Sequence, residues 1–90
     1  MPDRIALQTL SKLMKKDALL YLYLIRQNPS RFKDLPGNSF TKAARLKELV
    51  ELGMIDKSIV IEKSETSLGY KLTDKGERIM TKLDELLRAI

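Results

Sequence analysis

Apolar and polar residues between Ser39 and Gly53 alternate with the period of an amphipathic α-helix. Asn38 or Ser39 can cap its start, and Gly53 suits the left-handed position that often follows a helix. The pattern therefore predicts a helix over about 39–52. Its predicted inner face comprises Ala43, Leu46, Leu49 and Val50, and its predicted outer face comprises Thr41, Ala44, Arg45 and Glu48.

Helical patterns also occur at both ends of the chain. Asp3 can cap a first helix that runs to about Met14. Thr73 or Asp74 opens a last helix, where Asp74 with Glu77 fits a capping arrangement. Both helices carry an apolar stripe. The stripe of the first helix comprises Ile5, Leu7, Leu10, Leu13 and Met14, and that of the last comprises Ile79, Met80, Leu83, Leu86, Leu87 and Ile90.

The run from Ala18 to Ile25 is apolar on all sides. A short run of this kind could be a buried strand, since periodicity alone does not decide. Because Asp17 can cap it and Asn28-Pro29 is a good helix stop, we favour a helix. A helix that is apolar all round needs cover on all sides, so we expect it at the centre of the core.

Residues 55–63 alternate with period two, as in a half-buried strand, with Ile55, Lys57, Ile59 and Ile61 on one face. Residues 63–67 are polar and predict a turn, and 69–72 form the returning strand. Residues 31–35 predict a short extended or one-turn helical piece with Phe32 and Leu35 inward. The order helix, helix, short piece, helix, strand, strand, helix predicts a mainly α fold with a small β-hairpin, and residues 1–90 form one domain.

The composition favours one class of partner and excludes some kinds of site. Seventeen Lys and Arg against 12 Asp and Glu give a net charge of +5, which favours polyanionic partners such as nucleic acid. Cysteine is absent, which excludes disulfides and thiolate zinc sites, and histidine is absent, which removes the usual general base. No apolar run is long enough to span a bilayer, and no signal-peptide pattern is visible. We expect a soluble cytoplasmic protein, associated with the nucleoid, with no metal or other cofactor.

Three motifs follow one another in the chain: Arg31-Phe-Lys-Asp-Leu35, Arg45-Leu-Lys-Glu-Leu-Val-Glu-Leu-Gly-Met-Ile55 and Gly69-Tyr-Lys-Leu-Thr-Asp-Lys-Gly76. This series resembles the winged helix-turn-helix transcription regulators of the HxlR-like and MarR-like groups, over roughly residues 18–88. The stretch before the long helix is shorter than usual in these groups, and Lys42 stands where they tend to place an apolar residue. The cysteine that some HxlR-like members use for redox sensing has no counterpart here.

The resemblance implies sequence-specific binding to double-stranded DNA. The helix at 39–52 would enter the major groove, and a wing over about 55–72 would contact phosphates or the minor groove. Arg45 can present a bidentate fork to guanine, while Arg31 and Lys33 suit phosphates. Lys42 is favoured as a boundary residue over a base reader. The candidate DNA-binding residues are Arg31, Lys33, Asn38, Ser39, Thr41, Lys42, Arg45, Lys63, Ser64, Thr66 and Lys71.

We also expect a homodimer, because one small domain offers too little surface to cover its apolar helices. The helices at 1–15 and 74–90 would form the interface. Two-fold symmetry would place two recognition helices about one DNA turn, roughly 34 Å, apart on a pseudo-palindromic site. The candidate interface residues are Leu7, Leu10, Met14, Met80, Leu83, Leu87 and Ile90.

Two other function classes are open to the sequence. A winged helix can serve as a protein-interaction module without reading DNA, and acidic residues on the proposed DNA side leave room for this. An enzyme is disfavoured, because the near carboxylates Asp84 and Glu85 are adjacent on one helix and point apart. The acidic residues in question are Glu48, Glu51, Glu62 and Glu65.

Overall fold

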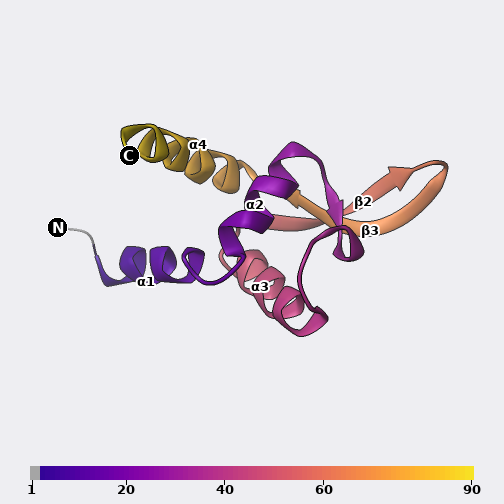
Figure 1. Ribbon diagram of the computed structural model, residues 1–90, viewed down its shortest axis with the longest axis horizontal. Helices are drawn as coiled ribbons and strands as arrows, with labels where there is room; N and C mark the ends of the chain where they lie inside the picture. The colour runs from indigo at the N-terminus through magenta and orange to yellow at the C-terminus, as the bar shows by residue number, and fades with distance from the viewer. Residues whose placement is uncertain (1–2) are drawn as a thin grey trace.

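The computed structural model describes residues 3–90, apart from the side chain of Glu62, and has the predicted winged-helix order (Figure 1). The described chain forms four α-helices, one 3-10 turn and a three-stranded antiparallel sheet in the order β1-β3-β2. The elements are α1 (Arg4–Leu13), α2 (Ala18–Gln27), β1 (Ser30–Arg31), η1 (Phe32–Asp34), α3 (Ser39–Glu51), β2 (Ile55–Glu62), β3 (Glu65–Leu72) and α4 (Asp74–Ala89).

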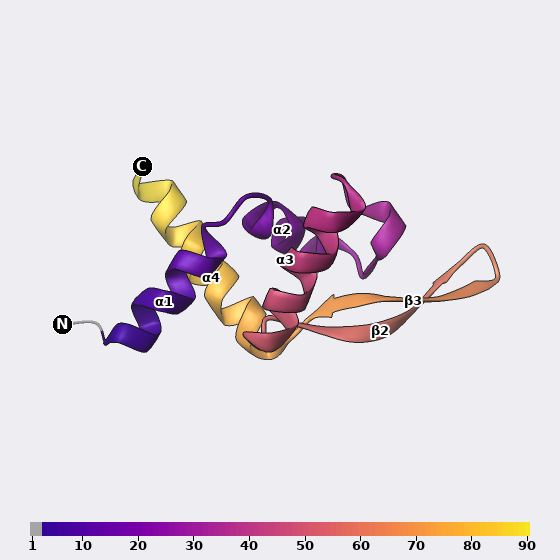
Figure 2. The same cartoon turned by 90° about the horizontal axis from the view of Figure 1, so that it is seen from below.

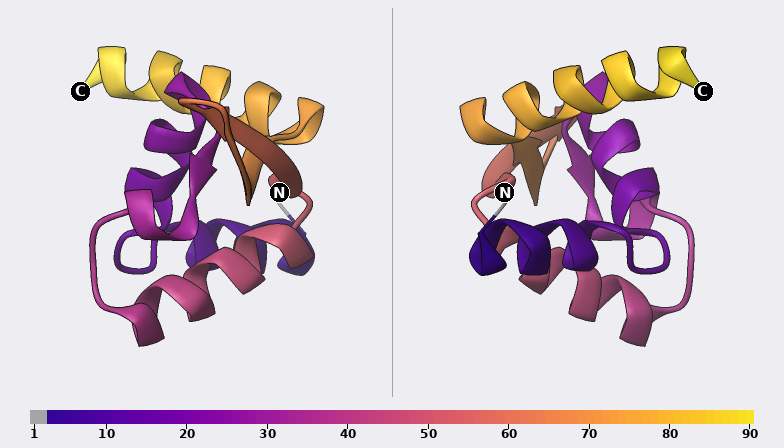
Figure 3. Two further views of the ribbon diagram at one scale, coloured as in Figure 1. Left: turned by 90° about the vertical axis from the view of Figure 1, so that its right-hand side faces the viewer. Right: turned by 90° about the vertical axis from the view of Figure 1, so that its left-hand side faces the viewer.

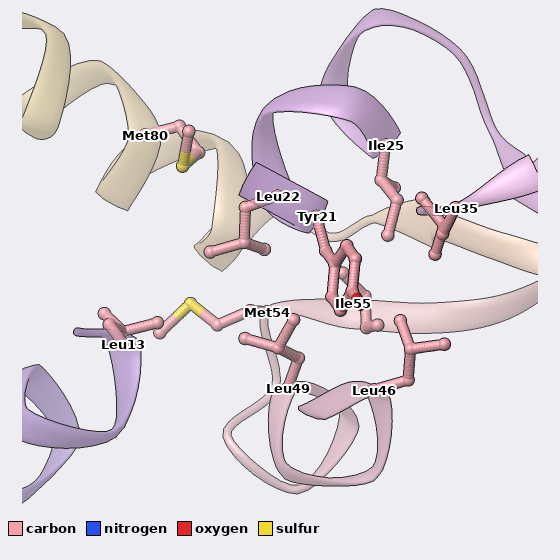
Figure 4. Close-up of a cluster of buried hydrophobic side chains, with 10 residues drawn as sticks. All are labelled: Leu13, Tyr21, Leu22, Ile25, Leu35, Leu46, Leu49, Met54, Ile55 and Met80. Carbon is pink, nitrogen blue, oxygen red and sulfur yellow. The ribbon is translucent and has the colours of Figure 1, made fainter. Parts of the chain in front are cut away.

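Helix α2 lies at the centre of the molecule, as its all-apolar sequence predicts (Figure 1). It contributes Tyr21, Leu22 and Ile25 to a core that also takes side chains from α1, α3, α4 and the base of the hairpin (Figure 4). The Tyr21 hydroxyl donates to the Pro36 carbonyl at 2.7 Å and so ties the turn before α3 to the core. The core comprises Leu13, Tyr21, Leu22, Ile25, Leu35, Leu46, Leu49, Met54, Ile55 and Met80.

The two ends of the long axis are occupied by different elements (Figure 2). Helices α1 and α4 project from one end, and the β2–β3 hairpin projects from the other, which gives extents of 49 × 26 × 21 Å. Helices α3 and α4 lie on opposite sides of the body (Figure 3). The molecule therefore separates its terminal helices from its wing.

Most helix boundaries follow their local capping signals. Asp3 accepts from the Ala6 amide at 2.7 Å and Asn38 accepts from the Thr41 amide at 2.8 Å. Gly53 follows α3 with φ +76°, the left-handed conformation expected there. Asp17 is different: it occupies the predicted N-cap position of α2, but its φ is +68° and its side chain makes no capping bond. The tight turn from Lys15 places its backbone in a left-handed conformation instead.

The hairpin is longer and less covered than the sequence predicts. Its turn consists of Lys63 and Ser64, with φ of +50° and +69°, and β3 already begins at Glu65. The predicted turn over 63–67 is therefore wrong in its extent. Ile59 and Ile61 are 63% and 73% exposed, so the predicted half-buried face holds only near Ile55. The helices cover the base of the sheet, and the distal half extends beyond them (Figure 2).

The junction between the hairpin and α4 is a close backbone contact. Thr73 caps α4 by accepting from the Gly76 amide at 3.0 Å, and its hydroxyl also lies within bonding distance of the Gly53 and Met54 carbonyls. A Cβ on Gly76 would collide with the Met54 carbonyl oxygen. The Thr-Asp-Lys-Gly sequence thus allows α4 to start directly against the end of α3.

Arg26 joins α2 to α4. Its guanidinium donates to Glu77 Oε1 at 3.0 Å and to Asp84 Oδ2 at 2.6 Å, and the Tyr23 hydroxyl donates to Asp84 Oδ1 at 3.0 Å. The hydrogen bond from Arg26, together with that from Tyr23, lowers the pKa of Asp84. This polar clamp holds α4 across the central helix.

Candidate nucleic-acid interface

Helix α3 presents a different face to solvent from the one its apolar spacing predicts. Ala43, predicted to face inward, is exposed, whereas Arg45 and Glu48 are only half exposed. Lys42 lies inside with Leu46 and Leu49. The buried face therefore keeps Leu46 and Leu49 as predicted but includes Lys42 in place of Ala43. Its open face comprises Ser39, Phe40, Ala43, Lys47 and Glu51.

Lys42 is a structural residue. Only 7% of it is exposed, its ammonium donates to the Phe32 carbonyl at 2.9 Å, and the same nitrogen lies 4.4 Å from the centre of the Phe32 ring. This cation–π contact and hydrogen bond place the charge against η1 rather than toward solvent. We therefore remove Lys42 from the predicted DNA-binding residues.

Arg45 is held by contacts within the chain. Its Nε donates to the Lys16 carbonyl at 3.0 Å, and its Nη1 pairs with Glu48 Oε1 at 3.0 Å. Lys15 binds the other oxygen of Glu48 at 3.1 Å. Burial opposes ionisation of Glu48, but Lys15 and Arg45 outweigh it and lower the pKa of that carboxyl. The predicted outward projection of Arg45 is therefore wrong, because the loop between α1 and α2 covers it.

The first turn of α3 is open. Asn38 is exposed but its side-chain oxygen is committed to the cap, Ser39 is exposed, and Thr41 is half-buried. Phe40 is 86% exposed, which is unusual for an aromatic side chain in a helix. Phe40 was not among the residues predicted to bind DNA, and neither was Lys47, which is exposed two turns further along the same face. Phe40, Ala43 and Lys47 fall at helical spacing, and this spacing was the signal in the sequence that could have placed them on one face.

Arg31 and Lys33 lie on β1 and η1, beside the core. Arg31 binds Asp34 in a bidentate manner, with 2.9 Å from Nε to Oδ2 and 3.1 Å from Nη2 to Oδ1. This hydrogen bonding lowers the pKa of Asp34. Lys33 is exposed. Of these two predicted phosphate contacts, Lys33 is the more accessible.

The wing carries its predicted polar residues at and near its tip. Lys63 and Ser64 form the two-residue turn and are exposed. Thr66 lies on β3 opposite Ile61, and Lys71 lies near the base opposite Asp56. Thr66 and Lys71 are also exposed. The wing thus presents cations at both its tip and its base.

A groove of about 380 Å³ separates α3 from the sheet. Lys47 and Glu51 line its helical wall, and Lys57 and Tyr70 line its strand wall. Lys57 is exposed and is a second cation that the sequence analysis missed. The groove places a lysine on each side of the space between the recognition helix and the wing.

The predicted interface residues fall into two groups. Leu7, Leu10, Met14, Leu87 and Ile90 are 46–92% exposed, and Leu83 is half-buried. Met80 is fully buried in the core against α2, so the prediction is wrong for this residue. An apolar cavity of about 210 Å³ between α1 and α4 is lined by Leu10, Leu13, Met14, Leu19, Tyr23, Leu83, Leu86 and Leu87.

Among the described residues, no group of three or more His, Cys, Asp or Glu side chains is placed to hold a metal ion. Over the same part of the chain, each helix is too short or too polar to cross a membrane.

The chain is matched by a known family. The sequence fits the pattern described as HxlR-like helix-turn-helix over residues 12–90. The chain belongs to this family. Family membership places it among DNA-binding transcription regulators. The resemblance drawn from the three sequence motifs is therefore confirmed.

Solved structures agree with the family. Diamide-treated YodB from B. subtilis is similar to the chain with a TM-score of 0.81 and 22% identity, covering 98% of this chain and 91% of that one. The reduced form of the transcriptional regulator YodB from B. subtilis is similar with a TM-score of 0.79 and 26% identity, covering 98% of this chain and 90% of that one. A protein described as a MarR-family transcriptional regulator from Porphyromonas gingivalis W83 is similar with a TM-score of 0.73 and 23% identity, covering 98% of this chain and 92% of that one. No match was found among curated proteins.

Proposed function

We propose that the protein binds double-stranded DNA sequence-specifically as a homodimer and thereby regulates transcription. Helix α3 enters the major groove, and the β2–β3 hairpin contacts flanking phosphates or the minor groove. The observation that carries this proposal is the open start of α3, where Ser39 and Phe40 of the first turn and Ala43 of the second face solvent. Residues at the start of a recognition helix are those that reach base edges.

Charge supports the same arrangement. Lys33, Lys47, Lys57, Lys63 and Lys71 are exposed on η1, α3 and the wing. Lysines at such positions neutralise phosphates and fix the register of a protein on the duplex without reading its sequence. Ser39 and Ser64 are exposed hydroxyls that can add phosphate or base contacts.

Homodimerisation would supply the second half of the binding site. Apolar side chains of α1 and α4 remain exposed at the end of the molecule opposite the wing (Figure 2). A second copy that covers them by two-fold symmetry would carry a second α3, and the two half-sites would form a pseudo-palindrome. The proposed place of action is the cytoplasm, on the nucleoid.

Selection of bound duplexes from a random pool, with the mass of the chain in solution measured in parallel, tests the proposal. We expect one enriched pseudo-palindromic sequence, bound with an affinity whose logarithm falls by about 0.9 per neutralised phosphate for each unit of log salt. Enrichment of no sequence, or binding without salt dependence, would contradict the proposal.

Charge reversal identifies the binding face. Lys47→Glu changes an exposed residue of α3, whereas Arg45 is unsuitable because its reversal would also repel Glu48. The matched control is Arg78→Glu, an exposed site on α4 rather than on α3 or the wing. We expect K47E to weaken binding to the selected duplex and to reduce the salt slope, while R78E leaves the slope unchanged.

A second candidate is a protein-interaction module. The exposed Ile59, Ile61 and Leu68 of the hairpin favour it, because their side chains share one face of the two strands. Of the acidic residues on the proposed DNA side, Glu51 and Glu65 are exposed, Glu48 is committed to Lys15 and Arg45, and the Glu62 side chain lies outside the described residues. Duplex binding that is unchanged in K47E would favour this candidate.

A further inference from the structure

We infer that Phe40 is a specificity-determining residue that reads the C5-methyl group of a thymine in each half-site. The inference rests on the proposed function and adds the chemistry of the base that α3 recognises. Thymine presents its methyl group in the major groove, and an apolar side chain such as Phe recognises it by contact.

The exposure of Phe40 has no explanation within the chain. It occupies the second position of α3 and is 86% exposed, more than any other large apolar side chain described except the terminal Ile90. The core is complete without it, since Lys42, Leu46 and Leu49 form the buried side of the helix. Phenylalanine is among the side chains most often buried, so one left in water at the start of α3 is placed to contact a ligand there.

Its position separates Phe40 from the other exposed apolar residues. The first turn of α3 points away from α1 and α4, whereas the last turn lies near them (Figures 1 and 2). The proposed contact between two copies therefore leaves Phe40 uncovered. The hairpin's apolar residues lie on another element. Phe40 is thus available to the duplex in the assembled dimer.

The neighbours of Phe40 suit close approach to a base edge. Ala43 lies about one turn further on the same open face, and its small side chain lets the helix axis come near the bases. Lys47 follows one turn later and can bind a phosphate or a guanine. From its start, the open face of α3 therefore presents an apolar, then a small, then a cationic side chain. This order predicts a half-site with thymine at the position that the first turn contacts.

Replacement of thymine by uracil tests this at the level of one methyl group. In the duplex selected from the random pool, each thymine is changed singly to uracil, which keeps base pairing and removes the methyl. We expect wild-type binding to weaken about fourfold at one position in each half-site, the effect of losing one buried methyl contact. Phe40→Ala should bind thymine and uracil at that position equally.

Two variants make the test specific. Phe40→Leu keeps an apolar side chain and should retain part of the preference for thymine. Lys47→Ala should weaken binding to both duplexes and keep the ratio between them. Circular dichroism should show that F40A remains folded, since its side chain contributes little to the core.

The outcomes separate the two proposals. If no duplex is selected, the proposed function fails and the inference falls with it. If a duplex is selected but uracil has no effect at any position, or has the same effect in F40A, only the role of Phe40 is overturned. A change in the mass of F40A in solution would assign Phe40 to contact between copies and would equally overturn the inference.

Discussion

At the scale of single residues, two lysines of α3 carry the same charge but differ in their exposure to solvent. Lys42 reaches back over Phe32 and is buried, while Lys47 on the next turn is exposed. A lysine can be buried when its stem packs on apolar surface and its ammonium finds a carbonyl and a ring. Whether a cation of α3 faces DNA therefore depends on what lies beneath it.

Removal of the Lys42 contact should destabilise the fold. Lys42→Ala loses the cation–π contact and the hydrogen bond to the Phe32 carbonyl, which we expect to cost about 2 kcal/mol in chemical denaturation. Lys42→Met keeps the apolar stem and should lose less. The salt dependence of DNA binding should not change in K42M, and a reduced slope would return Lys42 to the interface.

At the scale of elements, contacts between α4 and its neighbours set where that helix lies. Gly76 permits the backbone of its first turn to approach the Met54 carbonyl, and Arg26 binds Glu77 in the same turn and Asp84 further along the helix. One contact is steric and the other electrostatic, so they respond to different perturbations.

Gly76→Ala should lower stability although alanine is the better helix former. Helix propensity would favour alanine by about 1 kcal/mol, but the added methyl overlaps the Met54 carbonyl and should cost about 2 kcal/mol net. Thr81→Ala, an exposed change on the same helix, is the control and should stay within about 0.5 kcal/mol of wild type. Equal midpoints for G76A and wild type in urea would disprove the close contact.

The Asp84 clamp should make stability depend on pH. Its hydrogen bonds from Arg26 and Tyr23 lower the pKa of Asp84 below its ordinary value of 3.8. The ionised clamp is therefore complete above that value and is lost as pH falls through the lower pKa of the folded state. We expect Asp84→Asn to lower Tm at pH 7, with the difference from wild type shrinking below pH 3.8.

The control for the clamp is Glu85→Gln, which changes the adjacent carboxyl. Glu85 lies 3.6 Å from Lys82 on the exposed side of α4. Because such surface pairs contribute little, E85Q should have nearly the Tm of wild type. A Tm difference for D84N that persists unchanged under acid would mean that the asparagine acts through packing rather than through charge.

At the scale of the whole molecule, the terminal helices and the wing lie at opposite ends of the long axis (Figure 2). The apolar faces of α1 and α4 stay exposed because the body of one chain ends before them (Figure 2). Exposed apolar surface of this kind marks an interaction site. The proposed dimer would cover it and leave α3 and the wing open.

A charge placed on this surface should separate the copies. Leu87→Glu changes a residue that is 54% exposed, so the fold should persist while the mass measured by light scattering falls to that of one chain. Binding to a duplex with both half-sites should weaken, since a single chain contacts only one. The control is Ala89→Glu, an exposed change in the last turn of α4 outside the predicted stripe. An L87E variant with wild-type mass would refute this interface.

The sequence by itself determined which elements form and in what order. Helix periodicity, the caps Asp3, Asn38 and Thr73, and the stop at Gly53 are local signals, because helical hydrogen bonds join residues four apart. The one-turn piece before α3 and the central position of α2 were likewise predictable. Composition and the three motifs were sufficient for the family.

Only the tertiary structure decided how those elements face one another. Ala43 is open and Lys42 closed because η1 and the α1–α2 loop pack on adjacent faces of α3, and no helical period contains that information. Met80 is buried and Leu87 is exposed because the core covers only the first half of α4, and the second half extends beyond it. Ile59 is exposed because the hairpin outruns its helices. Periodicity defines a face, but contacts distant in sequence determine what covers it.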